Sequence, residues 1–226
     1  MRRRWRWLWR VGVVVLLAAA VNPALAWRLE GTLRRTLATP YVTVRLVGWP
    51  TAVVTGEFAR VTVIVRRATI RGLVVDEFAA RLRGARLDPL QAGLRGQIAV
   101  RAVDSGSATI RLLQEDVQRA VQDRPYVEAA AVRFADNMVS LASTVKVAGA
   151  TVEVSLAGRL VVEDTRYVVL RVDTMTVSGL ALPAGVANLV IAPLNPLLSV
   201  NALPVSLRLT GVEVSDGQAV ITAEAQ

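Results

Sequence analysis

The side chains that could do chemistry are acids and arginines, because the 226-residue chain contains neither histidine nor cysteine. It therefore has no histidine general base, no thiol nucleophile, no disulfide and no imidazole or thiolate metal ligand. Of three pairs of adjacent acids, Glu115-Asp116 is expected at a helix start, which leaves Asp76-Glu77 and Glu163-Asp164. Paired carboxylates can hydrolyse glycosides. Both pairs fall near predicted strand ends, where acids are usually solvated. We expect no enzyme, no metal and no cofactor, with a carboxylate hydrolase as a distant alternative.

The basic residues are almost all arginines, since Lys146 is the only lysine among 27 Lys and Arg residues. Arginine can bind a phosphate through two parallel hydrogen bonds. The net charge of +9 is concentrated in the first ten residues, which hold five arginines. The rest of the chain has 22 basic residues against 18 acids. Its arginines are scattered and no basic run is interleaved with aromatic residues, which argues against nucleic-acid binding.

The N-terminus has the pattern of a secretory leader. A basic segment, MRRRWRWLWR, precedes an apolar run from Val11 to Val21 and the small-residue motif Ala24-Leu25-Ala26. The distribution of arginines places everything after the apolar run outside the cytoplasm. We favour cleavage after Ala26, because Pro23 would interrupt a spanning helix. A retained membrane anchor is the alternative.

The chain after the leader is expected to form one β-rich domain. Residues 1–26 are the leader, 27–40 a linker and 41–226 the domain. From Tyr41 onward, β-branched residues alternate with period 2. The expected strands are 41–47, 58–70, 73–75, 77–82, 97–103, 126–134, 138–147, 151–162, 167–177, 205–214 and 219–223.

Two short turns predict the register of two hairpins. A loop at Ala148-Gly149 would pair Val145 with Val152. A type I′ turn at Asp216-Gly217 would pair Val214 with Ala219.

Two segments break the strand pattern. Leu113, Val117, Ala120 and Val121 recur at helical spacing, which predicts a short amphipathic helix ended by Pro125. The other segment, residues 174–207, is uncharged over 34 positions and contains four prolines, too many for a membrane-spanning helix. We expect an apolar helix at about 184–192 followed by an apolar loop.

Apolar residues occur on both faces of several strands, for example in residues 58–66 and 167–177. Such a sheet is either covered on both faces or curved around an apolar cavity. The expected helices are too few to cover both faces. The composition therefore favours a curved sheet with a groove of lipid size. The alternative is a sheet whose core is filled by side chains and encloses no groove.

The order of these features resembles the LmeA-type family of bacterial phospholipid-binding proteins. The resemblance rests on a strand leading to Trp49-Pro50 and then Gly56-Glu57-Phe58. It continues through Leu73-Val74-Val75-Asp76, the strand-to-helix segment 108–117, and Leu203-Pro204-Val205 with the last hairpin. It covers residues 43–223. One departure is that Leu112-Leu113 cannot cap the helix, where family members have Ser or Thr.

The resemblance implies an α+β, mostly β fold. A long curved antiparallel sheet would wrap around one or two short helices and enclose an apolar groove for acyl chains, as in tubular lipid-binding domains. The expected function is to bind phospholipid or another amphiphile at a membrane surface and to handle envelope lipids. The alternative is a structural or partner-binding envelope protein. The predicted lipid-contacting residues come from the uncharged segment and are Leu182, Val186, Leu189, Val190, Leu194, Leu197 and Leu198.

Overall fold

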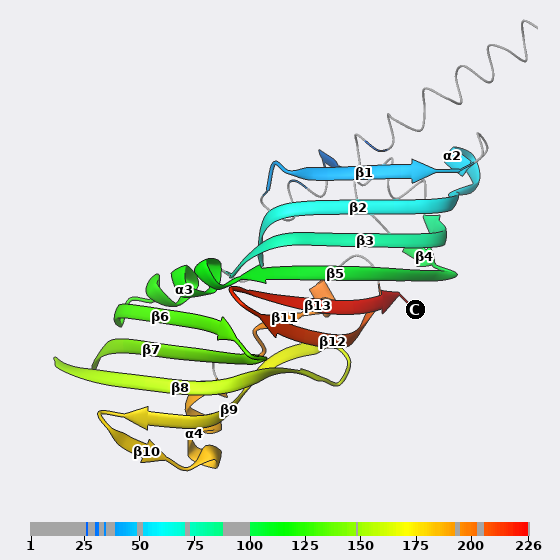
Figure 1. The fold of residues 1–226 in the computed structure, drawn as a ribbon. Helices are drawn as coiled ribbons and strands as arrows, with labels where there is room; N and C mark the ends of the chain where they lie inside the picture. The colour runs from blue at the N-terminus through cyan, green and yellow to red at the C-terminus, as the bar shows by residue number, and fades with distance from the viewer. Residues whose placement is uncertain are drawn as a thin grey trace, which may run out of the picture.

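The computed structural model describes residues 26, 30–31, 34, 39–48, 52–70, 73–87, 100–147, 149–192, 195–202 and 206–225. Most of the described chain is β-strand, paired antiparallel into two sheets that lie one after the other along an elongated molecule (Figure 1). The expectation of a mostly β, antiparallel fold with short helices is confirmed. The leader predicted at residues 1–26 lies outside the described residues except for Ala26.

The first sheet, here sheet A, has seven strands in the order β1-β2-β3-β5-β13-β12, with β4 paired to β3. Its strands are β1 Val42–Val47, β2 Glu57–Ile70, β3 Leu73–Leu87, β4 Val100–Ala102, β5 Ser105–Leu113, β12 Leu207–Ser215 and β13 Gln218–Ala225. The C-terminal hairpin therefore inserts beside β5 and completes the sheet.

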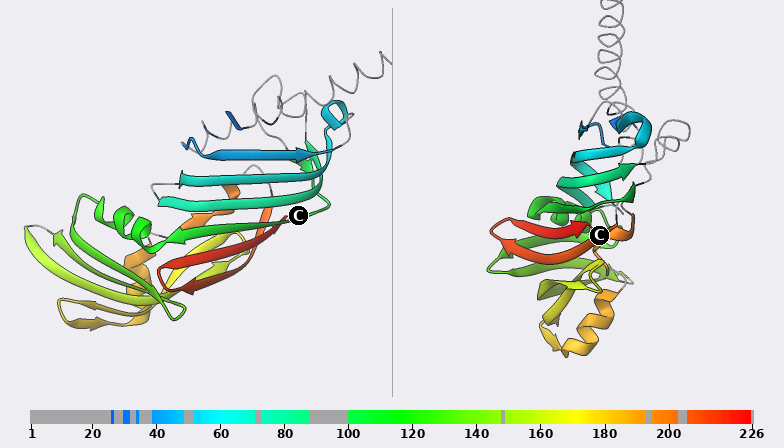
Figure 2. Two further views of the ribbon diagram at one scale, coloured as in Figure 1. Left: turned by 45° about the horizontal axis from the view of Figure 1, so that its top comes forward. Right: turned by 90° about the vertical axis from the view of Figure 1, so that its right-hand side faces the viewer.

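The second sheet, here sheet B, has six strands in the order β10-β9-β8-β7-β6, with β11 paired to β9. Its strands are β6 Val127–Ala135, β7 Met138–Val147, β8 Ala150–Glu163, β9 Tyr167–Val177, β10 Leu180–Leu182 and β11 Leu198–Ser199. Sheet B is curved, as the turned views show (Figure 2).

The helices are short and lie at the sheet borders. They are α2 Ala52–Thr55, α3 Gln114–Gln122 and α4 Ala184–Ile191, and a 3₁₀ turn, η3, spans Val200–Ala202. The predicted amphipathic helix is thus α3 and the predicted apolar helix is α4. Leu113 stands at the N-cap of α3 without a side-chain hydrogen bond, as the missing Ser or Thr requires.

The two sheets share one hydrophobic core at their junction. Ile110 and Ile221 of sheet A and Phe134 and Val168 of sheet B belong to the same buried cluster. The junction is also hydrogen-bonded, because the side chain of Asn137 in the β6–β7 turn accepts from the amide of Val214 at 3.0 Å. Side chains therefore fill the inner faces where the sheets meet.

The mixed apolar faces of two strands arise where the backbone departs from regular alternation. In β9 the register shifts against β8 between Ala157 and Gly158, so Val172 and Met175 are both buried although three positions separate them. In β3, Gly84 has φ +58, and the buried set passes from Leu82 to Ala85. At such irregularities the side chains that point inward change from one set of alternate positions to the other. This accounts for part of the apolar residues found on both nominal faces of these strands.

The registers predicted for both hairpins are confirmed, with Val145 opposite Val152 and Val214 opposite Ala219. The predicted type I′ turn at Asp216-Gly217 is wrong. That type needs positive φ at both central residues, and only Gly217 has it, at +77°.

Candidate functional site

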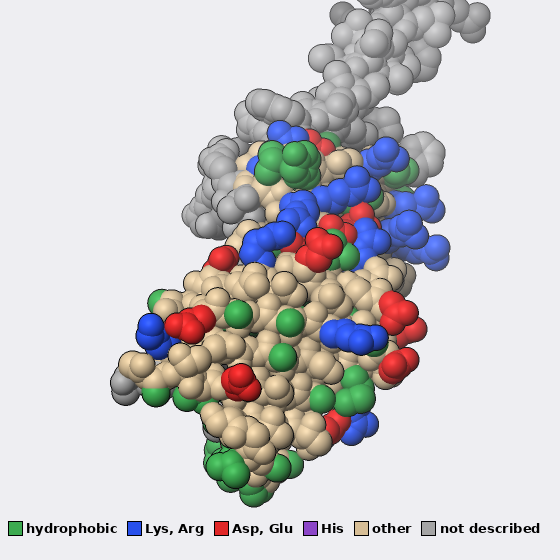
Figure 3. All heavy atoms as spheres, turned by 60° about the vertical axis from the view of Figure 1, so that its left-hand side comes forward, with side chains coloured by type: hydrophobic (Ala, Val, Ile, Leu, Met, Phe, Trp, Pro, Cys, Tyr) green, Lys and Arg blue, Asp and Glu red, His purple; other side chains and the backbone are tan. Residues whose placement is uncertain are grey.

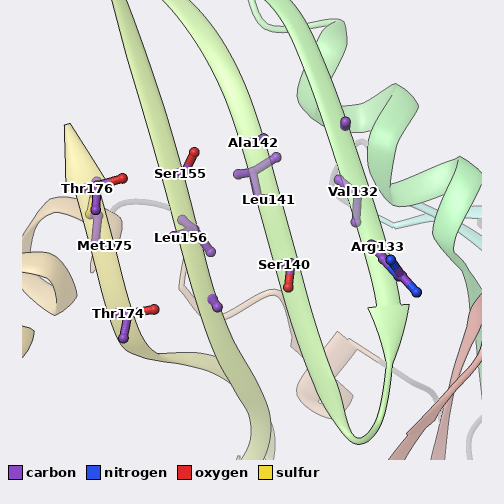
Figure 4. Close-up of a pocket in the computed structure, with 12 residues that line it drawn as sticks. Val132, Arg133, Ser140, Leu141, Ala142, Ser155, Leu156, Thr174, Met175 and Thr176 are labelled. Carbon is purple, nitrogen blue, oxygen red and sulfur yellow. The ribbon is translucent and has the colours of Figure 1, made fainter. Parts of the chain in front are cut away.

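Sheet B carries a hollow of about 400 Å³, lined by strands β6 to β9 (Figure 4). This volume lies within the range of roughly 300–1,000 Å³ typical of small-molecule sites. The alternate residues Val132, Leu156 and Met175 are buried in the core. The lining residues between them are mostly exposed, so the hollow lies on the outer face of the sheet.

Two rows of small side chains form the hollow, because the strand register brings them level across four strands. One row runs Ala131, Ala142, Ser155 and Thr176. The next row runs Arg133, Ser140, Ala157 and Thr174. Apart from Arg133, no side chain in these rows is larger than threonine. A curved sheet with such short side chains leaves room for a ligand above them.

A second hollow of about 260 Å³ adjoins the first and shares Ala131, Ala142 and Ser155 with it. It extends toward Ala129, Thr144 and Glu153. Together the two hollows make a shallow trough across β6, β7 and β8. Its lining of methyl groups and hydroxyls carries a charge only at Arg133 and Glu153.

Arg133 is the cation of this site. It lies at the side of the first hollow, near the end of β6, and its side chain is exposed. Within the part of the chain that the structure describes, no carboxylate forms an ion pair with it. An unpaired guanidinium beside an uncharged trough can donate hydrogen bonds to a phosphate or carboxylate ligand.

Other arginines near the trough are paired with acids of the same sheet. Arg159 donates two hydrogen bonds to the carboxylate of Asp173, at 3.0 and 3.1 Å, and Arg171 pairs with Glu163 at 3.2 Å. The hydrogen bond with Asp173, together with its negative charge, raises the pKa of Arg159 above its ordinary value. These arginines have partners already, which distinguishes them from Arg133.

Side-chain amides hold both sides of sheet B in place. From α3, the Oε1 atoms of Gln114 and Gln118 accept from the amides of Phe134 and Val132, at 2.9 and 3.2 Å. At the other side, the Oδ1 atoms of Asn188 and Asn195 accept from Val172 and Leu170 in β9, at 3.1 and 3.0 Å. The uncharged segment 174–207 thus has a structural role that its composition did not reveal.

The residues predicted to contact lipid are divided between the surface and the core. Val186 and Leu189 lie exposed on α4, and Leu180 lies exposed on β10. These three residues are here called the tip. Leu180 is 73% exposed and Leu189 is 75% exposed. Figure 3 shows hydrophobic side chains gathered at this end of sheet B.

The other predicted residues lie elsewhere. Leu182 and Leu197 are half-buried against core clusters, and Leu198 is buried at 2% exposure. The Val190 side chain and Leu194 are outside the described residues. The trough was missed because alternating Ala, Ser and Thr carries no hydrophobic signal. Small residues at alternate positions of four adjacent strands would have indicated it.

The two acid pairs do not come together. Asp76 and Glu77 pair with Arg111 at 2.9 and 3.6 Å, in sheet A. Glu163 belongs to sheet B, where it pairs with Arg171. The described residues contain no group of acids that could hold a metal ion. Among the described residues, Asp76, Glu77 and Glu163 are thus engaged by arginines on two different sheets.

Comparison with known proteins gives one match. A family model described as LmeA-like phospholipid-binding matches residues 13–224 of the chain. Neither the curated proteins nor the solved structures give a match. Among the described residues, no helix has the length and apolar character to cross a bilayer.

Proposed function

Because this chain belongs to the LmeA-like phospholipid-binding family, we propose that it binds a phospholipid or similar amphiphile outside the cytoplasmic membrane and handles lipids of the cell envelope. The observation that carries the proposal is the trough of sheet B with Arg133 at its side, an arginine that has no ion-pair partner among the described residues. The N-terminal leader pattern supports the location.

An acyl chain would lie along the trough, over the methyl groups of Ala131, Ala142 and Thr176. Each methylene withdrawn from water would contribute roughly 0.8 kcal/mol. Arg133 would take the phosphate, since a guanidinium can donate two parallel hydrogen bonds to it. Such binding needs no bond to be made or broken, so the proposed role is non-catalytic.

The tip would serve as the contact with the membrane from which the lipid comes. Its three residues belong to segment 174–207, which contains no charged residue. Exposed apolar groups of this kind mark contacts with a partner or a membrane. Of the lipid-contacting residues predicted from the sequence, we therefore retain Val186 and Leu189 for this role.

A structural or partner-binding envelope protein is the second candidate. It is favoured by the buried core at the junction, where side chains of both sheets belong to one hydrophobic cluster. This candidate predicts that the trough stays empty. The two candidates thus differ in a single measurable property, which is lipid occupancy.

The test is to purify the full chain from the producing cells and identify bound lipid by mass spectrometry. A short-chain phosphatidylglycerol, used below its micellar concentration, then titrates the trough. The variant Ala142→Phe fills the hollow, and the control Ala59→Phe places the same side chain at an exposed alanine of sheet A. We expect Ala142→Phe to weaken binding at least about tenfold and Ala59→Phe to leave it unchanged. An empty protein that ignores the short-chain lipid would refute the proposal.

A further inference from the structure

The outer face of sheet A carries four exposed arginines on three neighbouring strands. Arg45 of β1 and Arg81 of β3 lie level on either side of Thr62. Arg60 of β2 lies directly opposite Arg83 of β3 in the adjacent row. Neighbouring strands are about 5 Å apart, so the four guanidinium groups share one small area, here called the arginine face.

The arginine face differs from Arg66, Arg86 and Arg111 of the same sheet, which form ion pairs with acids. Arg66 pairs with Glu77 at 3.1 Å, and Arg86 pairs with Glu57 at 3.5 Å. Within the described part of the chain, no carboxylate forms an ion pair with Arg45, Arg60, Arg81 or Arg83. Like charges placed across a strand pair are unfavourable. Four such charges therefore indicate an anionic partner outside the chain.

The surroundings of the arginine face favour a bilayer over a nucleic acid. Val47 and Thr43 share this face, and the exposed Tyr41 stands just before β1, four positions from Arg45 and not among the four arginines. Proteins that bind single-stranded nucleic acid instead place aromatic side chains along the basic groove, where bases stack on them. In Figure 3 a band of cationic side chains over sheet A, with acidic side chains among them, and the hydrophobic side chains at the end of sheet B are seen from one side of the molecule. A basic area and an apolar tip on one side match the charged surface and apolar interior of a membrane.

We propose that Arg45, Arg60, Arg81 and Arg83 dock the protein on the anionic surface of a phospholipid bilayer. Docking through sheet A directs the same side of sheet B, with its tip, toward the bilayer. The inference rests on the proposed function for its biological meaning, but the docking is physically separate from lipid binding in the trough. Each arginine near an anionic membrane strengthens docking about fivefold.

The absence of cysteine makes a site-specific test possible in the full chain, whether or not the leader also binds membranes. Val47→Cys places one thiol beside Arg60, at a side chain that is already exposed. A polarity-sensitive dye on this thiol reports contact with vesicles. The vesicles are phosphatidylcholine with or without phosphatidylglycerol. The test variant is Arg45→Gln with Arg81→Gln, and the charge-matched control is Arg66→Gln with Arg86→Gln.

We expect the dye to respond to vesicles that contain phosphatidylglycerol and to lose the response as salt increases. The test variant should weaken docking about twenty- to thirtyfold, and the control only slightly. Binding of short-chain phosphatidylglycerol without vesicles should stay unchanged in both. Loss of that binding alone would contradict the proposed function and leave docking intact.

Three results would overturn the docking proposal. One is an equal effect of the test and control variants, which would show that docking depends on the net charge of the protein and not on the positions of these arginines. Another is an equal response to pure phosphatidylcholine, which would assign the contact to the tip alone. The third is tighter binding of duplex DNA or RNA than of anionic vesicles at the same salt concentration.

Discussion

Arg67 and Asp116 join sheet A to α3 through a hydrogen bond of 2.6 Å, from Nη1 of Arg67 to Oδ2 of Asp116. The Asp116 side chain is 2% exposed and also accepts from Arg119 at 2.9 Å. Replacing Asp116 by Asn removes the buried negative charge that forms ion pairs with Arg67 and Arg119. We expect Asp116→Asn to lower the free energy of unfolding by about 2–3 kcal/mol.

Urea unfolding of the full chain measures this effect. Glu115→Gln is the matched control, because Glu115 is exposed on the same helix turn. An equal decrease in the free energy of unfolding in both variants would show that stability depends on negative charge at the start of α3 and not on the buried ion pair of Asp116.

Glycine-to-alanine substitutions at two positions should change the free energy of unfolding in opposite directions. At Gly158 a Cβ atom would collide with the carbonyl oxygen of Arg171 and lie 2.9 Å from the Cα of Val172. Backbone cannot move away easily, so Gly158→Ala should destabilise the protein by about 2–3 kcal/mol. At Gly185 in α4 nothing lies within 4 Å, and Gly185→Ala should stabilise it by about 0.5–1 kcal/mol. Thermal and urea unfolding of the two variants test the close approach of β8 and β9.

The amides of Val132 and Phe134 are protected by glutamine side chains of α3. Changing Gln114 and Gln118 to Ala leaves both amides without these acceptors. We expect faster hydrogen exchange at Val132 and Phe134 and a loss of about 1 kcal/mol per hydrogen bond. The control Glu115→Ala removes an exposed side chain of the same helix. Unchanged exchange at both amides would contradict the role of the glutamines.

Arg133 should contribute to lipid affinity without contributing to stability, because it has no acidic partner among the described residues. Arg133→Gln removes a charged donor and should weaken binding of short-chain phosphatidylglycerol about ten- to a hundredfold. Arg124→Gln, at an exposed arginine just after α3, is the control. Isothermal titration gives the affinity. An unchanged affinity in Arg133→Gln would show that the lipid phosphate does not bind at Arg133.

Two leucines predicted alike from the sequence should behave differently when shortened to Ala. Leu198 is buried in the core shared by both sheets, so Leu198→Ala should cost about 2–5 kcal/mol. Leu189 is exposed at the tip, so Leu189→Ala should change stability by less than about 0.5 kcal/mol. Leu189→Ala should instead weaken binding to vesicles. Urea unfolding and vesicle sedimentation separate the two roles.

The sequence predicts strands well where apolar residues alternate, and it predicts helices where they recur at helical spacing. It divides β3 into two pieces, because Asp76 and Glu77 look like a strand end. In the structure both acids stay within the strand, since Arg111 neutralises them. Long-range ion pairs of this kind cannot be inferred from one sequence.

The candidate site is predicted less well than the fold, because its lining is defined by register and not by local pattern. Ala131, Ala142 and Ser155 become neighbours only when three strands align. The uncharged segment attracted attention for its composition, yet Asn188 and Asn195 within it bond to the backbone of β9. Polar residues in an apolar run can thus be structural.

Side-chain oxygens accept from backbone amides on four strands of the two sheets, β1, β6, β9 and β12. Besides the glutamines on β6 and the asparagines on β9, Glu30 accepts from Val44 in β1, and Asn137 accepts from Val214 in β12. An amide that is bound in this way is not available to an incoming strand. Strand addition at these positions is therefore disfavoured, both for a second copy of this protein and for a partner peptide.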